Sequence, residues 1–557
     1  MPNIQETREN HAFWSPVPGV QGGPTWQDLP EEALRCLTRP ICAVRTADGI
    51  RFTTSGSACL GAGNAPKGAL PLAGLVPPMD PARLGDASFC DDHALSLPLY
   101  AGSMAHGISS EQLVSAMGRA GMLGFYGAAG EAPGDIEAAL VRLQKALPGV
   151  SFGFNLINSP NDPAWEMAVA DIYLGNGLHL VEASAYIFPT PALVKYRVSG
   201  LHRGPDGSVV APNRVIAKAS RAEVAARFFA PPPEKILRRL VESGHITAIE
   251  AMLAAEVPLA QDLTGEADSG GHTDHRAALA MLPSLQQARD EAAARYGYSV
   301  PLRIGLAGGI ATPQSAAAAF AMGAAWVVTG SVNQSCVESG TSDTVGALLA
   351  KAAQTDVANV PSADMFEMGV NVQVLKKGVR FAERAARLRE LYKIHESLDD
   401  IPAEDRRTLE ETVFRMPLEE VWEQTKRFFE SRDPRQIARA AAYPRHKMAL
   451  VFRSYLGQSA RWANSGAPDR VDDYQIWCGP GMGAFNNWTH GSFMESPEGR
   501  SAPLVARNLL FHAAVLLRAA SLRAQGVTLP ASALRCPPLR DEEISKYWTV
   551  QQGNDHS

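Results

Sequence analysis

Short apolar runs alternate with longer amphipathic segments between about residue 94 and residue 340. The apolar runs have the length of strands, and the segments between them repeat apolar residues three and four apart, as one-faced helices do. Strands that alternate with helices predict a parallel sheet. We expect strands at residues 96–102, 122–128, 152–157, 178–184, 215–220, 257–267, 302–309 and 325–331. Eight such units within roughly 240 residues predict a closed (β/α)8 TIM barrel.

An open, doubly wound sheet is the alternative α/β fold. It usually has fewer strands and carries its glycine signature on the first turn, whereas here the glycine pairs follow the last strands. The barrel is therefore favoured. Residues 204–207 (GPDG) predict a turn between two short β runs, which we interpret as a surface excursion. Ser109 is expected to cap the first barrel helix, with Gln112 three residues on.

The two ends of the chain have other patterns. Residues 1–90 are rich in glycine and proline, with a hairpin expected around Asp48 and Gly49, and no function follows from them. The C-terminal part is mainly helical, with an aromatic, glycine-rich loop expected at residues 473–488. We therefore expect an N-terminal extension (1–90), a barrel (91–340) and a helical substrate or lid domain (341–557).

Composition narrows the class of protein. The chain is 46% hydrophobic and 20% charged, which is typical of a globular protein. Its net charge of −6 provides no general attraction for nucleic acid or a membrane surface. The N-terminus lacks a signal-peptide pattern and the seven cysteines form no CxxC pair, so we expect a cytoplasmic protein with reduced thiols.

Glycines follow the last two expected strands, where TIM barrels commonly bind phosphate. Gly308 and Gly309 lie in AGGIATP, and Gly330 and Ser331 lie in TGS. Glycine lets backbone N–H groups approach a ligand closely, so these loops predict a phosphate site. The alternative is that the glycines only make tight turns.

Other candidates lie on the same face of the barrel. Ala101, Gly102 and Met104 end the first strand, Asn155 lies on the third, and Lys218 lies on the fifth. A lysine within an apolar strand needs a partner, because an unpaired buried charge is costly. That partner is either a ligand or a carboxylate such as Glu182, and the sequence leaves both open.

His272 follows the sixth expected strand directly after Gly270 and Gly271. Its ordinary pKa lies near neutrality, and the glycines would let the loop approach a flat cofactor. A satisfied core histidine is the alternative. A metal site at residues 268, 272, 274 and 275 is disfavoured because no supporting ligand cluster is visible, so no metal is expected.

At this point the residues carry a resemblance. DSGGH (268–272), AGGI and TGS are similar to the nitronate monooxygenase (2-nitropropane dioxygenase) family of FMN-binding barrels. Longer blocks, among them EADSGGHTDHR, ADMFEMGVNVQVLKKG and DYQIWCGPGMGAFN, resemble the PfaD family. Those proteins are trans-acting enoyl reductases of polyunsaturated fatty acid synthases and trans-acyltransferase polyketide synthases.

The resemblance implies an FMN cofactor and NADPH as reductant. Gly308, Gly309, Gly330 and Ser331 would hold the FMN phosphate, and His272 would lie near the flavin as the proton donor. The residues implied along the isoalloxazine and ribityl chain are Ala101, Gly102, Met104, Asn155 and Lys218, with Gly270 and Gly271 beside them. Asp-Ser precedes GGH where the wider family commonly has Glu-Ala, and simple nitronate monooxygenases lack the C-terminal region.

The implied reaction is reduction of an α,β-unsaturated thioester carried by an acyl carrier protein. A nitronate monooxygenase and a non-catalytic flavoprotein scaffold are the alternatives, and related barrels imply a homodimer. Carrier proteins are acidic, so a local basic patch is expected, although each candidate could equally be an ordinary solvated side chain. The candidates are Lys195, Arg197, Arg238, Arg239, Lys376, Lys377 and Arg380. The loop at 473–488 would either cover the acyl chain or pack in a core.

Overall fold

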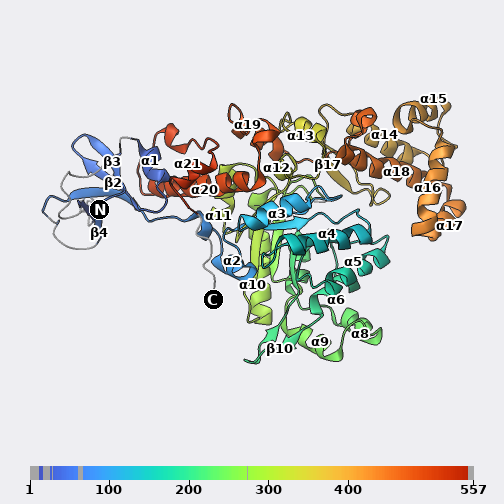
Figure 1. The fold of residues 1–557 in the computed structure, drawn as a ribbon, viewed down its shortest axis with the longest axis horizontal. Coiled ribbons are helices and arrows are strands. Elements are labelled where there is room, and N and C mark those ends of the chain that lie inside the picture. The colour runs from blue at the N-terminus through green and yellow to red at the C-terminus, as the bar shows by residue number, and fades with distance from the viewer. Residues whose placement is uncertain are drawn as a thin grey trace, which may run out of the picture.

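The computed structural model describes residues 12–16, 26–27, 29–60, 65, 67–271 and 274–549. The molecule is elongated, with a small sheet at one end, a barrel in the middle and a group of helices at the other end (Figure 1). His272 lies outside the described residues, so its predicted place beside a cofactor stays a prediction.

Eight parallel strands close into a barrel in chain order, and the register of Val327 with Leu99 joins the last strand to the first. Every strand lies within one of the eight expected segments except for Arg214, which begins β12 one residue early, so the predicted fold is confirmed. The strands are β6 (Leu99–Ala101), β7 (Leu123–Tyr126), β8 (Gly153–Ile157), β9 (Leu180–Ser184), β12 (Arg214–Ala219), β13 (Asp262–Glu266), β14 (Arg303–Ala307) and β15 (Val327–Thr329).

Helices follow the strands and cover the barrel, as the apolar stripes predict. Two further helices lie between β12 and β13, and two short ones follow β15. The helices of this part of the chain, beginning with α2 before the first barrel strand, are α2 (Ala87–His93), α3 (Glu111–Arg119), α4 (Pro133–Ala146), α5 (Pro163–Gly175), α6 (Pro191–Val198), α7 (Ala222–Phe229), α8 (Glu234–Glu242), α9 (Ala248–Leu253), α10 (Ala278–Tyr296), α11 (Pro313–Ala321), α12 (Ser331–Gln334) and α13 (Asp343–Leu349). The expected excursion is the hairpin of β10 (His202–Arg203) and β11 (Val209–Val210).

The predicted cap of the first barrel helix is wrong by one residue. Ser110, not Ser109, caps α3 by accepting a hydrogen bond from the backbone N–H of Leu113. The hydroxyl of Ser109 instead donates to the carbonyl of Gly102 and accepts from the N–H of Met104. Ser109 therefore shapes the loop after β6, which borders the pocket described below.

The N-terminal part is an antiparallel sheet in the order β3-β2-β5-β1-β4. The pair Thr46 and Gly49 closes the hairpin expected around Asp48. The elements are β1 (Ala12–Ser15), α1 (Pro30–Arg35), β2 (Ile41–Thr46), β3 (Gly49–Thr53), β4 (Ser57–Leu60) and β5 (Leu70–Val76).

The C-terminal part is mainly helical, as expected, and adds a strand pair. Its elements are β16 (Val357–Pro361), β17 (Asn371–Leu375), α14 (Phe381–Ile394), α15 (Ala403–Thr408), α16 (Leu418–Arg432), α17 (Pro434–Ala442), α18 (Pro444–Ser465), α19 (Gly481–Thr489), α20 (Ala502–Ala524) and α21 (Asp541–Ser545). The interpretation of 473–488 as a loop is wrong in its second half, which forms α19. A π-helical segment lies at Leu409–Phe414, and short 3-10 segments lie at Pro81–Arg83, Ala254–Glu256, Pro468–Asp473, Pro497–Gly499 and Ala531–Leu534.

The apolar side chains of the C-terminal part belong to two different cores. Most of those from Val360 to Leu456 form a cluster of their own, whereas Leu375, Val379 and those from Ala502 to Trp548 join the core of the barrel. Helix α20 packs along α11 and β5, between the barrel and the N-terminal sheet (Figure 1). It is long and apolar enough to cross a membrane by composition, but 67% of its most apolar window is buried, as in a core helix.

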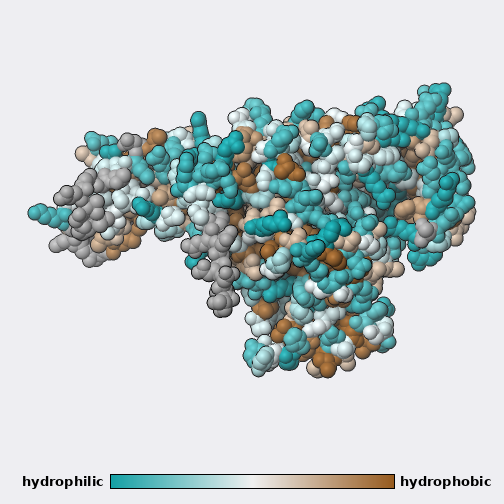
Figure 2. Space-filling model, in the orientation of Figure 1, coloured by the Kyte–Doolittle hydropathy of each residue, from teal (hydrophilic) through white to brown (hydrophobic). Residues whose placement is uncertain are grey.

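The outer surface in Figure 2 is hydrophilic over most of α14 to α18. Apolar residues are exposed in small groups, such as Ile249 and Met252 on α9. Scattered exposed apolar residues are normal for a globular protein. The large apolar surface of interest is therefore inside the molecule, at the end of the barrel.

Candidate active site

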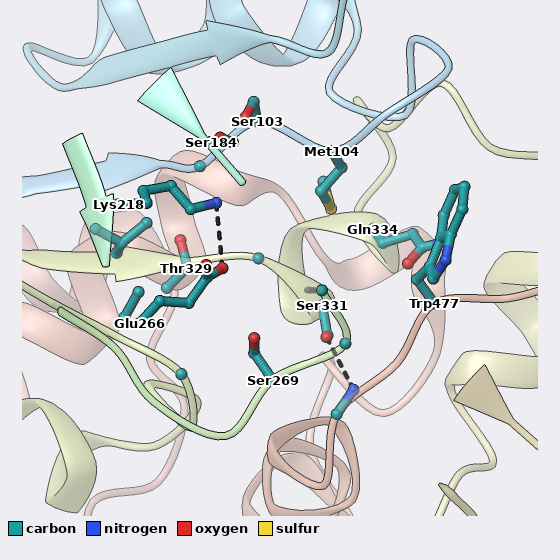
Figure 3. A pocket seen from close by; sticks show the side chains of 18 of the residues that line it. Ser103, Met104, Ser184, Lys218, Glu266, Ser269, Thr329, Ser331, Gln334 and Trp477 are labelled. Atoms are coloured by element: carbon teal, nitrogen blue, oxygen red, sulfur yellow. Dashed lines mark hydrogen bonds and ion pairs between the residues drawn. The ribbon is translucent and has the colours of Figure 1, made fainter. Parts of the chain in front are cut away.

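A deep pocket lies at the carboxyl ends of the barrel strands (Figure 3). Loops after most of the barrel strands line it, together with Val372 and residues 477, 479 and 481 of the C-terminal part. Its empty space is about 1310 Å³, including the part open to solvent. Concave, mainly apolar pockets with a few polar groups are the usual form of a small-molecule site.

The structure brings nearly all of the predicted site residues to this pocket. Its lining includes Gly102, Met104, Asn155, Lys218, Gly270, Gly271, Gly308, Gly309, Gly330 and Ser331. Ala101 is the exception, because it is fully buried in the barrel core and pairs with Thr329 and Gly124 on the neighbouring strands. Ala101 does not line the pocket, so its expected contact with the cofactor stays a prediction, and the residue supports the loop that follows it.

The loops after β14 and β15 present free backbone donors. The N–H groups of Gly309, Gly330 and Ser331 donate to no acceptor among the described residues. Gly308 and Gly309 have positive φ angles of 86° and 74°, a conformation that side chains rarely adopt. Unpaired N–H groups on adjacent glycine loops form an anion-binding concavity, which fits a phosphate.

Lys218 points into the pocket and is also ion-paired (Figure 3). Its Nζ lies 3.2 Å from Oε1 of Glu266 and 3.9 Å from Oε2 of Glu182. Burial lowers the pKa of Lys218, but the two carboxylates outweigh burial and raise the pKa above its ordinary value. The side chain is therefore cationic, and it satisfies both alternatives left by the sequence: it has a structural partner and it lines the ligand space.

Glu182 is fully buried beneath Lys218 and holds the loop that follows β6 in place. It accepts hydrogen bonds from the Tyr100 hydroxyl at 3.0 Å, from the Ser103 N–H at 3.0 Å and from the Ser103 hydroxyl. Burial raises the pKa of Tyr100 well above its ordinary value, which keeps this phenol protonated as a donor. Glu182 thus holds the floor of the pocket in one arrangement.

Asn155 pairs its amide N–H groups with other atoms of the protein. Nδ2 donates to the carbonyl of Glu182 at 3.2 Å and to Oγ of Ser184 at 2.8 Å. A side-chain amide offers two donors and one acceptor oxygen. Only the oxygen is left to face a ligand, so Asn155 is suited to receive a hydrogen bond rather than to give one.

The acidic residues around His272 anchor its loop. Asp268 accepts a hydrogen bond from Nε2 of Gln373 at 2.9 Å and pairs with Nδ1 of His275 at 2.8 Å. Asp274 accepts from Ser220 at 2.8 Å and from Nε of Arg221 at 2.5 Å. The hydrogen bond from Arg221 holds the pKa of Asp274 at about 2. Both carboxylates therefore tie the loop to neighbouring elements.

The two glycines before His272 have different roles. A Cβ on Gly270 would lie 2.8 Å from the backbone nitrogen of Cys478, closer than real contacts allow. A Cβ on Gly271 would meet nothing nearer than Glu266 Oε1 at 3.6 Å, an ordinary contact. Gly270 is thus required by the segment that crosses it from the C-terminal part, a contact that sequence spacing cannot reveal.

The pocket lining includes residues that the sequence did not single out as site residues, among them Ser269 and Gln334. The hydroxyl of Ser269 is buried and has no hydrogen-bond partner among the described residues, and it points into the pocket in Figure 3. Trp477 belongs to the aromatic segment that was expected either to cover a ligand or to pack in a core. Its ring lines the pocket, whereas Tyr474 and Phe485 of the same segment are fully buried in the core, so the structure bears out core packing for these two aromatics and pocket lining for Trp477.

The prediction of an exposed basic patch is wrong for two of its seven residues. Lys195 and Arg197 are buried on α6, which packs between α5 and α8. Lys195 pairs with Asp171, and Arg197 donates to the carbonyls of Pro258 and Asn213. Both side chains are directed into the protein and held by internal partners, so neither belongs to an exposed basic patch. The other five candidates are exposed, on α8 and on the segment 376–380.

The closed eight-stranded barrel, with N–H groups on its last two loops that have no acceptor among the described residues, defines a (β/α)8 protein with a pocket at the carboxyl ends of its strands. The sequence profile described as nitronate monooxygenase matches residues 88–399, more than half of the chain. The chain belongs to the nitronate monooxygenase family. A second profile, the inserted helical domain of [acyl-carrier-protein] S-malonyltransferase, matches residues 395–474, which include α15 to α18.

Similar proteins come from two kinds of synthase. A polyunsaturated fatty acid synthase protein of Thraustochytrium sp. (strain ATCC 26185 / S-3) is 44% identical over 437 residues, covering 78% of this chain and 29% of that protein. Polyketide biosynthesis protein PksE of Bacillus subtilis (strain 168) is 42% identical over 435 residues, covering 78% of this chain and 56% of that protein. The chain thus spans less than two thirds of these relatives.

A solved structure is similar over nearly its whole length. It is the enoyl reductase domain of MlnA from the macrolactin biosynthesis cluster from Bacillus amyloliquefaciens. The identity is 37% and the TM-score is 0.76, and the match covers 80% of this chain and 99% of that domain.

Family membership implies that the pocket binds FMN. The residues present fit that group, because the unpaired N–H groups of Gly309, Gly330 and Ser331 suit its phosphate. The apolar lining, which includes Ile310 and Val328, suits a flat ring system.

Proposed function

We propose that the protein is an FMN-dependent enoyl reductase that uses NADPH. Its substrate is an α,β-unsaturated thioester carried by an acyl carrier protein, in polyketide or polyunsaturated fatty acid biosynthesis. The observation that carries this proposal is the similarity to an enoyl reductase domain over 99% of that domain. The curated relatives, which include a polyunsaturated fatty acid synthase protein and a polyketide biosynthesis protein, support the substrate class.

Bound FMN supplies hydride transfer, from the nicotinamide to the flavin and from the flavin to the β-carbon of the substrate. The chain itself binds and orients the reactants. The N–H groups of Gly309, Gly330 and Ser331 would hold the phosphate. Lys218, kept cationic by Glu182 and Glu266, would stabilise negative charge on a ligand in the pocket.

His272 is our proposed proton donor to the α-carbon. It follows the pocket residues Gly270 and Gly271 in the chain. The described residues on either side of it are anchored, Asp268 by Gln373 and Asp274 by Arg221. An acid with a pKa near neutrality is suited to this transfer.

The proposal extends to the setting of the enzyme. We expect a cytoplasmic homodimer whose partners are the acyl carrier domains of a synthase. Carrier domains are acidic, so association should weaken as salt increases.

The family profile favours one other reaction, the oxidation of nitronates by a flavin monooxygenase. Steady-state turnover separates the two. Purified holoenzyme with NADPH should consume NADPH only when crotonyl-pantetheine is present, and should form butyryl-pantetheine. Oxygen uptake with propyl-2-nitronate, without thioester reduction, would replace the proposal with the monooxygenase.

A further inference from the structure

Gln334, the last residue of α12, has an amide with no partner in the part of the chain that the structure describes. The residue is only 3% exposed and lines the pocket, and its side chain makes no hydrogen bond with any described residue. The amide is open to the pocket and is not sealed in the core, so it is free to pair with a ligand there.

Trp477 forms a rigid wall at the same end of the pocket, where its side chain and that of Gln334 point toward one another (Figure 3). Its backbone bridges to Val374 on β17. Its ring stacks on His106, with ring centroids 5.6 Å apart and planes within 5°. The imidazole is also packed closely on Gly130, where a Cβ would lie 2.2 Å from the ring.

The charge of the stacked imidazole is suppressed. Burial lowers the pKa of His106 to about 4, with Arg461 acting in the same direction. A neutral ring behind Trp477 leaves this end of the pocket without a charge from the histidine. The end thus offers an aromatic wall and a single amide.

This combination fits a flat, neutral carboxamide. An amide can give and receive a hydrogen bond with another amide, and an aromatic wall packs against a planar group. We propose that Gln334 and Trp477 form a subsite for the carboxamide of the ligand that exchanges hydride in this pocket. The subsite rests on the proposed function, which supplies two such ligands: the nicotinamide of NADPH and the pantetheine arm of the thioester.

The two sources are separated by measuring each half-reaction alone under anaerobic conditions. Gln334→Met replaces the amide with an apolar chain of similar length. Losing a hydrogen bond of about 1–3 kcal/mol corresponds to a rise in Kd of roughly 5- to 150-fold. We expect this rise for one ligand, either NADPH in flavin reduction or crotonyl-pantetheine in flavin reoxidation, and the affected half-reaction identifies the source.

Three controls make the test specific. Gln286→Met removes an amide that donates to the Met322 carbonyl and does not line the pocket, so both ligand Kd values should stay at the wild-type level. Trp477→Phe keeps an aromatic wall and should retain affinity, whereas Trp477→Ala should weaken the same ligand as Gln334→Met. If the thioester is the source, S-ethyl thiocrotonate, which lacks an amide, should bind wild type and Gln334→Met equally.

The subsite is overturned if Gln334→Met leaves both ligand Kd values within about two-fold of wild type. It is also overturned if the Kd for FMN rises in parallel, because Gln334 would then belong to the cofactor site. If Gln334→Met does not fold, Gln334→Glu keeps the shape and loses the N–H donors, and the same criteria apply to it. Failure of every thioester to reoxidise the flavin would instead reject the proposed function, while a raised NADPH Kd would still support the subsite.

Discussion

Lys218 brings a positive charge into the pocket, and carboxylates on two neighbouring strands balance it. Its exposed fraction is 12%, and Glu182 beneath it is fully buried. Removing one member of a buried ion pair is far more costly than removing both, because the remaining charge is stranded. The ion pair therefore fixes the pocket floor as well as the local charge.

Lys218→Met should lower the free energy of unfolding by about 3–5 kcal/mol. Adding Glu182→Gln should recover part of that loss, since the stranded carboxylate is then neutral. Urea unfolding of the two single variants and the double variant measures the coupling. A Lys218→Met protein as stable as wild type would show that the ion pair carries no such role.

His272→Ala should reduce turnover by about 10²- to 10⁴-fold, the usual contribution of a general acid. The variant should still bind FMN, because the phosphate donors are backbone groups on other loops. Flavin content and kcat on the same preparation test both parts. His275→Ala, which alters the partner of Asp268, separates loss of the acid from loosening of the loop. Unchanged turnover in His272→Ala would remove His272 from the chemistry.

Two elements far apart in the chain meet at the loop after β13. The Gly270 backbone packs on Cys478, and Gly479 donates its N–H to Ser331 at 3.3 Å. The segment 477–481 therefore contacts both the histidine loop and the expected phosphate loop.

Elements with local periodicity, such as the eight strands, could be predicted, because each depends on its own residues.

Features that depend on distant partners could not be predicted. Ser109 and Ser110 are adjacent before the same apolar stripe, and spacing does not decide between them. Lys195 is polar in sequence, but the packing of α6 between two other helices buries it beside Asp171. Gln334 and Trp477 lie 143 positions apart in the printed sequence, and only the fold places both on one pocket.

Gly270→Ala and Gly271→Ala form a matched pair for this contact. The first change forces Cβ against the Cys478 backbone and should cost about 1–3 kcal/mol of stability, the usual penalty of overpacking. It should also weaken FMN binding, since the segment 477–481 contacts Ser331. The second change should unfold like wild type, because its Cβ would meet nothing nearer than Glu266 Oε1 at 3.6 Å. Thermal unfolding compares the two variants, and equal losses of stability would contradict this packing.

At the scale of the whole molecule, α20 joins the N-terminal sheet to the barrel. Arg518 on this helix is fully buried and donates to the carbonyls of Leu34, Cys36 and Arg39. Burial lowers the pKa of Arg518 to about 10. One side chain thus satisfies three carbonyls of the N-terminal part.

Arg518→Met should leave the carbonyls of Leu34 and Arg39 without this donor, each at a cost of about 1–3 kcal/mol, and so loosen the N-terminal part. Proteolysis within residues 29–60 should accelerate, while FMN affinity stays unchanged because the pocket is built by other residues. Arg523→Met, an exposed change on the same helix, is the control. Equal proteolysis of the two variants would contradict the role of Arg518.

The central claim is that the flavin of this protein passes hydride to an enoyl thioester. The most direct measurement is anaerobic stopped-flow absorbance, in which holoenzyme reduced with one equivalent of NADPH is mixed with crotonyl-pantetheine. We predict rapid return of oxidised flavin with stoichiometric butyryl-pantetheine, and no such return with buffer alone. Flavin that stays reduced with the thioester, yet is reoxidised when oxygen and propyl-2-nitronate are added, would contradict the claim.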